Sequence, residues 1–560
     1  MRLTPLRAVL LIALFTLLAY ANSLRNGFVW DDETLVRENS FIRNSTYISA
    51  AFTTDLVHNS HGGTAYYRPL QTITYMVDYF YWGLNPVGYH LTNLLLHLLC
   101  AILVWLTIRQ FTDNPITALV VALIFAVNPI NTSAITYVAG RADSLALAGM
   151  LGAFLFYRHY REQPDRSHWF FVAALLCYTG ALFSRESAML FPALLLFVTG
   201  RPFGRAFRNA LPFAVLLFAF IAWRFAVIQL VDKPLTAPWH IPASLRVEIF
   251  FRSIATYFGL LLWPVHLQMD RQVAHASHWL TAAGAVCIVT GLIAYWRGNR
   301  NVRLGLGWFA IALLPMTGTL NLVATVAEHW LYVPMIGFYF ALASIIPWRK
   351  LTGAAALLVL LAMTARTIDR NGDWANGSVF FARQTQSARG SERAFTNLGH
   401  TLITAGNTDD GLKALRRAEE LDPRSATAKY NLAVVHLKRG ENELARQKLT
   451  ECAALDPTDA TIWELVAQIH EGQGHHALAL RYYRQAISCT RDVATRLRCA
   501  RFLIRHSHAK EALALLDECA YLEPGNAAVY RLLSEILHDI GQTTQATAAL
   551  DLASSLDRHS

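Results

Sequence analysis

The first residues with the means for chemistry are three consecutive acids, Asp31, Asp32 and Glu33, which directly follow Trp30. Neighbouring carboxylates repel one another unless they face solvent, a cation or a substrate, so one of them could have a raised pKa. Such a carboxylate can serve as a general base. The same acids also fit a helix N-cap with acids in its first turn. Spacing alone leaves both interpretations open.

Several further groups place an acid next to a base. They are Arg141 with Asp143, Arg185 with Glu186, Asp270 with Arg271, and Glu328 with His329. Each alone is typical of a local ion pair that ties helix ends together. Ionisable residues beside apolar segments are costly, so a set of them at one membrane face indicates a polar cavity. Its acids could activate a nucleophile and its cations could hold an anion.

Residues 66–97 combine aromatic and polar side chains. Arg68 follows a Tyr-Tyr pair and could bind phosphate or extend its charge toward lipid headgroups. The dense aromatics up to His90 favour an amphipathic helix at the membrane interface. His90, Asn93 and His97 share one helix face, which favours a polar seam between helices. Their spacing also suits metal ligands, but the sequence offers no third ligand.

The elements that position these residues follow from composition. The chain has 560 residues, of which 54% are hydrophobic and 16% charged, whereas soluble domains carry about a quarter charged residues. This composition excludes a disordered chain and argues against a single soluble globule. Many arginines lie beside apolar runs, so the net charge of +10 indicates topology anchors rather than nucleic-acid binding. The seven cysteines have no metal-ligand spacing and are interpreted as small core residues.

Apolar runs predict eleven membrane spans within residues 1–366, with the N-terminus cytoplasmic. The first run is expected to be an uncleaved helix, although it also resembles a signal peptide. The runs are 8–22, 91–108, 116–131, 141–157, 168–183, 187–199, 209–230, 279–296, 304–319, 330–347 and 351–366. Basic residues after alternate runs, such as Arg109 and Arg158, are expected on the cytoplasmic side.

Residues 246–264 do not fit this alternation. If they crossed the membrane, every later basic cluster would face the wrong side. We therefore expect a re-entrant or interfacial helix on the outer side, with Arg246, Glu248 and Arg252 in water. Residues 367–392 are expected to be a linker.

The C-terminal part, residues 393–560, repeats with a period near 34. Gly406, Gly440 and Gly474 are spaced by 34 residues, and Leu-Asp-Pro at 421–423 recurs at 455–457. This resembles the tetratricopeptide repeat (TPR), a pair of helices joined at a glycine turn. About five repeats fit, the fourth having lost its glycine near Ser507. Stacked repeats form a superhelix whose concave face binds peptides or partner helices.

The order of motifs carries a wider resemblance. NGFVWDDETLVRENSFI, YYRPLQTITYMVDYFYWGLNP, VAGRADSLA, FSRESAMLF, LQMDRQV and AEHWLYVP occur in this order before the repeats. This resembles the transmembrane-and-tetratricopeptide-repeat family of protein O-mannosyltransferases and their bacterial relatives, in the GT-C class of polytopic glycosyltransferases. The fold class implied is all-α: a GT-C-like polytopic membrane helical bundle followed by a TPR α-solenoid.

The resemblance implies residue roles. An acid in the first outer loop is the usual base, so that role falls on Asp31 or Asp32. Here Glu328-His329-Trp330-Leu331-Tyr332 stands where the family has Glu-Arg-Tyr-Leu-Tyr, so a fixed cation is in doubt, because histidine need not be charged at neutral pH. The residues expected to bind the donor phosphate are Arg68, Arg141, Arg271 and His329. The supporting polar residues are Tyr67, His90, Asp143, Glu186, Glu328 and Tyr332.

The function implied is transfer of a sugar from a polyprenyl- or dolichyl-phosphate donor to a hydroxyl, with protein Ser or Thr as the expected acceptor and the repeats binding acceptor or partner. No residue pattern requires a metal or another cofactor, although acids near a phosphate could hold a divalent cation. The alternative is a non-catalytic membrane scaffold whose repeats recruit partners. Two locations fit: a bacterial inner membrane with a periplasmic tail, or an endoplasmic reticulum membrane with a lumenal tail. The sequence leaves the sugar open.

Overall fold

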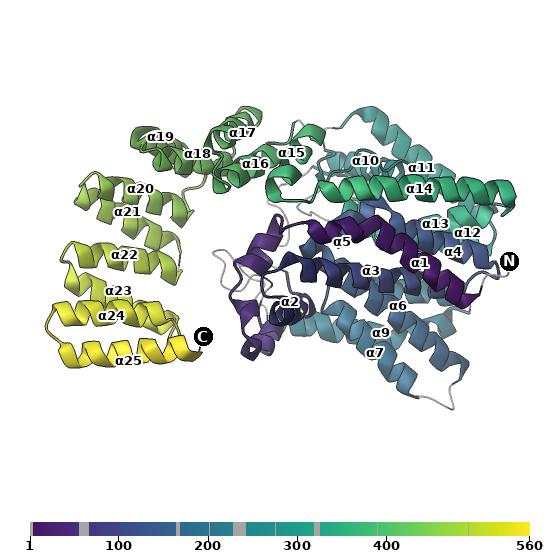
Figure 1. Cartoon of the computed structure of the whole chain (residues 1–560), viewed down its shortest axis with the longest axis horizontal. Coiled ribbons are helices and arrows are strands. Elements are labelled where there is room, and N and C mark those ends of the chain that lie inside the picture. The colour runs from purple at the N-terminus through teal and green to yellow at the C-terminus, as the bar shows by residue number, and fades with distance from the viewer. Residues whose placement is uncertain are drawn as a thin grey trace. The chain divides into compact units, whose positions relative to one another are not determined.

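The computed structural model of the chain is helical almost throughout (Figure 1). It describes residues 4–54, 56, 66–163, 168–200, 202–227, 242–274, 276–318, 325–388, 390–490 and 492–559. The chain divides into two compact units, residues 1–388 and 389–560. The predicted all-α class is confirmed.

Helices of the first unit coincide with all eleven predicted apolar runs, and α2, α5, α10 and α15 lie outside or at the edges of those runs. Their bounds are α1 Pro5–Tyr20, α2 Pro69–Trp82, α3 Pro86–Ile108, α4 Pro115–Val127, α5 Thr132–Ile135, α6 Arg141–Glu162, α7 His168–Leu182, α8 Phe191–Thr199, α9 Phe203–Val227, α10 Ala243–Leu262, α11 His278–Arg297, α12 Arg300–Leu313, α13 Pro334–Ile345, α14 Lys350–Gly372 and α15 Gly377–Ser387. Proline stands at the first position of α1, α2, α3, α4 and α13, where its missing N–H costs nothing.

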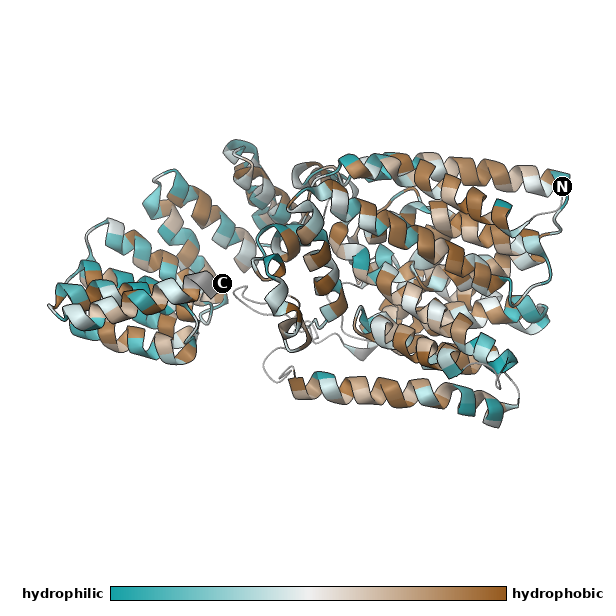
Figure 2. Cartoon of the chain, turned by 60° about the horizontal axis from the view of Figure 1, so that its bottom comes forward, coloured by the Kyte–Doolittle hydropathy of each residue, from teal (hydrophilic) through white to brown (hydrophobic). Residues whose placement is uncertain are grey.

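By length and apolarity, six of the described helices could each cross a membrane, or seven if α4 and the bent segment after it form one span. Three shorter apolar helices, among them α7 and α13, accompany them. Figure 2 shows that apolar residues dominate these helices, whereas the repeat unit mixes apolar and polar residues. The first unit therefore has the composition of a polytopic membrane bundle.

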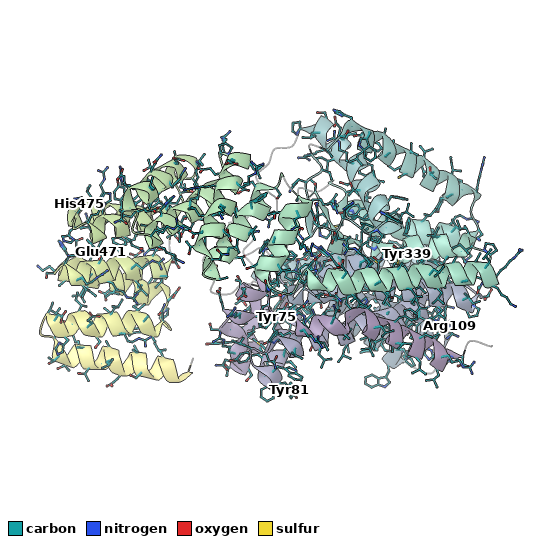
Figure 3. All side chains as sticks on the ribbon, turned by 45° about the horizontal axis from the view of Figure 1, so that its top comes forward. Tyr75, Tyr81, Arg109, Tyr339, Glu471 and His475 are labelled. Carbon is teal, nitrogen blue, oxygen red and sulfur yellow. The ribbon has the colours of Figure 1, made fainter. Side chains whose placement is uncertain are left out.

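Helices α1 and α14 end side by side. The Asn26 side chain donates to the Asn371 carbonyl over 2.9 Å, and the Asn371 side chain donates to the Ala19 carbonyl over 2.8 Å. We call this end of the bundle the site end. Arg109 lies at the opposite end from Tyr75 (Figure 3), and Arg158 lies near Arg109, because it donates to the Gln110 carbonyl.

Helix α10 covers most of residues 246–264. Its residues contact the segment that joins α12 to α13: the Tyr257 hydroxyl donates to the Met316 carbonyl, and the Ser253 hydroxyl donates to the Thr325 carbonyl. The expectation that Arg252 lies in water is wrong. Its side chain is 3% exposed, pairs with Glu248 and donates to the Ala274 carbonyl, because the loop after α10 folds back over it.

The expected linker does not begin at residue 367. Residues 367–388 form the end of α14 and the whole of α15, and they belong to the first unit. Burial explains the difference: Trp374 is fully buried and Phe380 is 1% exposed, so this segment packs into the bundle.

The second unit consists of five helix pairs, which confirms the TPR solenoid. The pairs are α16 Glu392–Thr404 with α17 Thr408–Leu421, α18 Ala426–Lys438 with α19 Asn442–Leu455, α20 Ala460–Gly472 with α21 His476–Cys489, α22 Val493–Arg505 with α23 Ala509–Leu522, and α24 Ala527–Asp539 with α25 Thr543–His559. Small residues at equivalent positions are fully buried where the paired helices approach, namely Ala418, Cys452, Ala486 and Cys519. The turns inside the pairs contain Gly406, Gly440, Gly474 and Gly541, all with positive φ.

In the fourth repeat, Ser507 stands in place of the turn glycine. It adopts the same left-handed conformation, with φ +62°. A left-handed conformation costs a residue with a Cβ about 1–2 kcal/mol relative to glycine. We expect Ser507→Gly to stabilise α22 and α23 by about 1 kcal/mol, which slows amide hydrogen exchange in these helices about fivefold. Ser488→Gly, at an exposed position of α21, is the control and should accelerate exchange locally. If Ser507→Gly did not slow exchange, the left-handed backbone of Ser507 would not be strained.

Candidate active site

The two adjacent aspartates lie in different environments. Asp32 is 1% exposed. One carboxylate oxygen accepts from the Val29 N–H over 3.1 Å and the other accepts from the Ala139 N–H over 2.7 Å. Asp31 is exposed and lies beside the Tyr137 hydroxyl. Asp32 therefore ties the first loop to the start of α6, while the Asp31 carboxylate remains accessible.

Trp30 is held between aromatic rings at the site end. It stacks on Tyr137 at 6.0 Å and on Phe380 at 6.1 Å between ring centroids, and Trp374 stacks on Tyr137 at 5.2 Å. The backbone of Trp30 is left-handed, with φ +58°, at a cost of about 1–2 kcal/mol. Two stacked pairs at about 0.5–1.5 kcal/mol each offset that cost. We call Trp30, Tyr137, Trp374 and Phe380 the aromatic box.

Burial raises the pKa of Asp32 from 3.8 to about 8, although backbone N–H groups oppose the shift. The folded protein thus retains a proton at neutral pH that the unfolded chain loses near pH 4, and the neutral Asp32 lowers repulsion on Asp31.

The raised pKa of Asp32 predicts that the stability of the folded loop falls as pH rises. A raised folded-state pKa means that stability is greatest below the unfolded pKa and falls as pH rises toward 8. We expect the amides of residues 31–37 to lose protection between pH 5 and 8, after correction for intrinsic exchange. Asp32→Asn, which cannot ionise, should remove the pH dependence. A loop equally protected across this range would contradict the shift.

Arg68, just before α2, belongs to a cluster of three arginines and two acids, which we call the arginine cluster. Arg68 pairs with Glu186 at 2.8 Å, and Arg185 pairs with Asp143 at 2.7 Å. Arg224 on α9 lies 4.0 Å from the other Glu186 oxygen and is 7% exposed. Three guanidiniums against two carboxylates leave one unit of positive charge at the edge of an apolar bundle, which a phosphate oxygen could neutralise.

Arg141 lies apart from this cluster in a pair of its own. Its side chain is fully buried, lies 2.5 Å from Asp78 and donates to the Asn93 side chain over 2.7 Å. The ring of Tyr75 lies 4.8 Å from the guanidinium. Asp78 neutralises Arg141, and these side chains tie α2 to α3 and α6.

Glu328 is the centre of another buried group. It is fully buried, with Arg370 at 3.5 Å and Arg271 at 4.0 Å. A two-residue pairing between β1 (Asp270–Arg271) and β2 (Val326–Ala327) brings these segments together. His329 follows in the short helix Glu328–Leu331. Burial lowers the pKa of His329, and Arg185 and Arg68 lower it further, so His329 is neutral at pH 7 and supplies no fixed cation.

The remaining predicted residues form hydrogen bonds within the bundle. His97 contacts the Tyr332 hydroxyl over 2.8 Å and the Ala126 carbonyl over 3.1 Å. His90 contacts the Gly27 carbonyl over 3.4 Å. The Tyr67 hydroxyl donates to the Phe52 carbonyl over 2.8 Å and accepts from the Trp223 indole. This is the geometry expected of a polar seam. Among the described residues, no three His, Cys, Asp or Glu side chains are grouped to hold a metal.

The groups are linked through α2. The Tyr75 ring lies 4.8 Å from the Arg141 guanidinium, and the charges of Asp32 and Arg68 also act on its hydroxyl. Figure 3 shows Tyr75 near the end of the first unit. Sequence reasoning missed Arg224, Arg370 and Asp78. A signal was available for Arg224, because an arginine within an apolar run is costly and marks a functional position. The partners of Asp78 and Arg370 lie far away in sequence, so no local signal identifies them.

The fold and the arginine cluster define a polytopic membrane protein with a buried polar site at one end and a TPR solenoid after it. The family described as dolichyl-phosphate-mannose-protein mannosyltransferase matches residues 81–227. Tetratricopeptide-repeat families match residues 396–460 and 460–492.

The chain is similar to several curated proteins along most of its length. It is 26% identical to human protein O-mannosyl-transferase TMTC3, covering 76% of this chain and 53% of that protein. It is 26% identical to human TMTC1, covering 77% and 57%, and 25% identical to Drosophila melanogaster Tmtc3, covering 76% and 56%. The chain thus spans about half the length of these relatives. This similarity, together with the matched families, confirms the predicted resemblance to the transmembrane-and-tetratricopeptide-repeat proteins.

Solved structures match over a smaller part. YrrB, described as a TPR protein with an unusual peptide-binding site, is 18% identical, covers 31% of this chain and 91% of its own, and has a TM-score of 0.27. MamA is 15% identical, covers 29% and 95%, and also has a TM-score of 0.27.

Proposed function

We propose that this protein transfers a sugar from a polyprenyl-phosphate-linked donor to a hydroxyl group, with a protein Ser or Thr as acceptor. The observation that carries the proposal is the arginine cluster, whose excess positive charge is largely buried within a membrane bundle. The names of the TMTC relatives favour mannose as the sugar.

In the proposed reaction, the acceptor hydroxyl oxygen attacks C1 of the sugar and the bond from C1 to the phosphate oxygen breaks. Asp31 takes the hydroxyl proton, because its carboxylate is exposed while Asp32 is occupied by backbone N–H groups. The leaving polyprenyl phosphate keeps the bonding electrons and gains one negative charge. Arg68, Arg185 and Arg224 stabilise that charge. A lipid tail would remain in the bilayer beside the bundle.

We further propose that the site end faces the non-cytoplasmic side and that the repeats present the acceptor there. Arg109 and Arg158 lie at the opposite end, which the positive-inside tendency assigns to the cytoplasm. Since α14 ends beside α1, the chain leaves the membrane unit at the site end.

The test uses the purified full chain in liposomes with a labelled polyprenyl-phosphate mannose and a Ser/Thr-rich peptide. We expect label on the peptide and release of polyprenyl phosphate in equal amounts. Release without peptide labelling would identify water as the acceptor and remove the protein acceptor from the proposal. If several polyprenyl-phosphate sugars gave neither product, the scaffold function would be favoured.

A further inference from the structure

We infer that the segment from Trp374 through α15, between the last membrane helix and the repeat unit, is a positioning element of the active site, acting through Trp374 and Phe380 on the backbone that carries Asp31. This inference rests on the proposed function for its meaning in catalysis. Its structural content, namely that α15 holds the Trp30 loop, stands on contacts alone.

The first observation is the conformation of Trp30. A bulky residue rarely adopts φ +58°, so the surrounding structure must hold it there. Asp31 and Asp32 follow immediately, and the Glu33 N–H donates to the Trp30 carbonyl over 3.1 Å. A change in the Trp30 backbone therefore reorients both carboxylates.

The second observation is where the rings that hold Trp30 come from. Phe380 on α15 stacks on Trp30, while Trp374 packs on Phe380 at 4.5 Å and on Tyr137 at 5.2 Å. Trp374 is fully buried and Phe380 is 1% exposed, so neither ring can be replaced by solvent without cost. One face of the aromatic box thus comes from residues more than 340 positions after Trp30 in the sequence.

The third observation is a pair of hydrogen bonds that fixes this segment to the Trp30 loop and to the segment before α6. The Gly27 N–H donates to the Ala375 carbonyl over 2.9 Å. The Thr136 hydroxyl donates to the Asn371 side chain over 2.7 Å, close to Tyr137. The end of α14 therefore holds both the Trp30 loop and the segment that leads into α6, and α15 completes the box between them.

α15 is also the last helix before the repeat unit. The helix ends at Ser387, and the repeat unit begins at residue 389. The segment that connects the repeats to the membrane bundle is therefore the same segment that packs on Trp30. A mere tether would not need two buried aromatic residues packed into the aromatic box.

The experiment compares Phe380→Leu with Phe213→Leu in the full-length protein. Phe213 is also fully buried in the first unit, but it packs on Tyr157, Tyr178 and Phe191, away from the box. Amide exchange of residues 31–37 should accelerate about tenfold in Phe380→Leu and stay unchanged in Phe213→Leu. Phe380→Tyr, which keeps the ring, should restore protection. Equal exchange in the two leucine variants would overturn the inference.

The second part of the experiment measures kcat and KM of the same variants. We expect Phe380→Leu to lower kcat at least tenfold while the KM for the lipid-linked donor stays within twofold, because the ion pairs of the arginine cluster involve no described residue of α15. Phe213→Leu should lower both kcat and protein yield only to the extent that it destabilises the bundle. If Phe380→Leu accelerated exchange but the unmodified protein transferred no sugar, the proposed function would be refuted. The positioning contact would then still stand. Normal kcat in a variant with accelerated exchange would refute the positioning role.

Discussion

Replacing Asp31 with asparagine is expected to lower kcat about 10³-fold, within the range that a positioned general base contributes. Asp31 is the exposed member of the pair, and asparagine keeps an oxygen that can accept from the neighbouring Tyr137 hydroxyl, so the substitution removes the proton acceptor with little change in packing. The folded state should keep its stability and its donor KM. The measurement is steady-state transfer from a labelled polyprenyl-phosphate mannose to a Ser/Thr peptide.

Two neighbouring variants make this result specific. Glu33→Gln removes an acid that pairs with Arg37 at 3.2 Å on the surface, and it should leave kcat unchanged. Asp32→Asn presents an amide N–H to one of the two backbone donors, so it should destabilise the loop by about 1–3 kcal/mol. An Asp31→Asn variant with full activity would transfer the role of base to another residue, with Asp32 as the next candidate.

Replacing Arg68 with glutamine is expected to raise the KM for the lipid-linked donor about 100-fold. A charge-assisted hydrogen bond to a buried phosphate contributes about 1.5–3 kcal/mol, and the cluster also loses its excess positive charge. Arg68→Lys should recover only part of the affinity, because lysine cannot form the two parallel bonds of a guanidinium. Donor dependence of the initial rate measures both variants.

A double variant separates phosphate binding from ion pairing. Arg68→Gln leaves Glu186 without its 2.8 Å partner, and Arg68→Gln combined with Glu186→Gln removes that imbalance. If Arg68 only neutralises Glu186, the double variant should regain the normal KM. If Arg68 binds the donor phosphate, the KM should remain high. Arg158→Gln, at the opposite end of the bundle, controls for loss of a positive charge and should have no effect.

Much of the architecture was predictable because it depends on local pattern. Each of the eleven apolar runs became a helix, since a long apolar segment can satisfy its backbone only within itself when it lies in lipid. The 34-residue period predicted five helix pairs, and even the degenerate turn at Ser507 kept its left-handed backbone. Burial of Ala418 and Cys452 followed from the same period.

The site was only partly predictable, because the environment of an ionisable group depends on distant residues. The sequence placed Arg68, Asp143 and Glu186 near one another through a family resemblance, and the structure brings them into one cluster. It did not reveal that Asp78 neutralises Arg141, or that Glu328 holds Arg370 as well as Arg271.

The sequence by itself determined the helices, the repeats and the positions of the charged motifs, because hydrophobic period and residue type act over a few residues. Only the tertiary structure decided which of two adjacent aspartates is exposed. That choice depends on the Ala139 N–H, 107 positions after Asp32, and on aromatic rings contributed by α15. Chain entropy does not favour contacts over such separations, so they form only when the whole bundle packs.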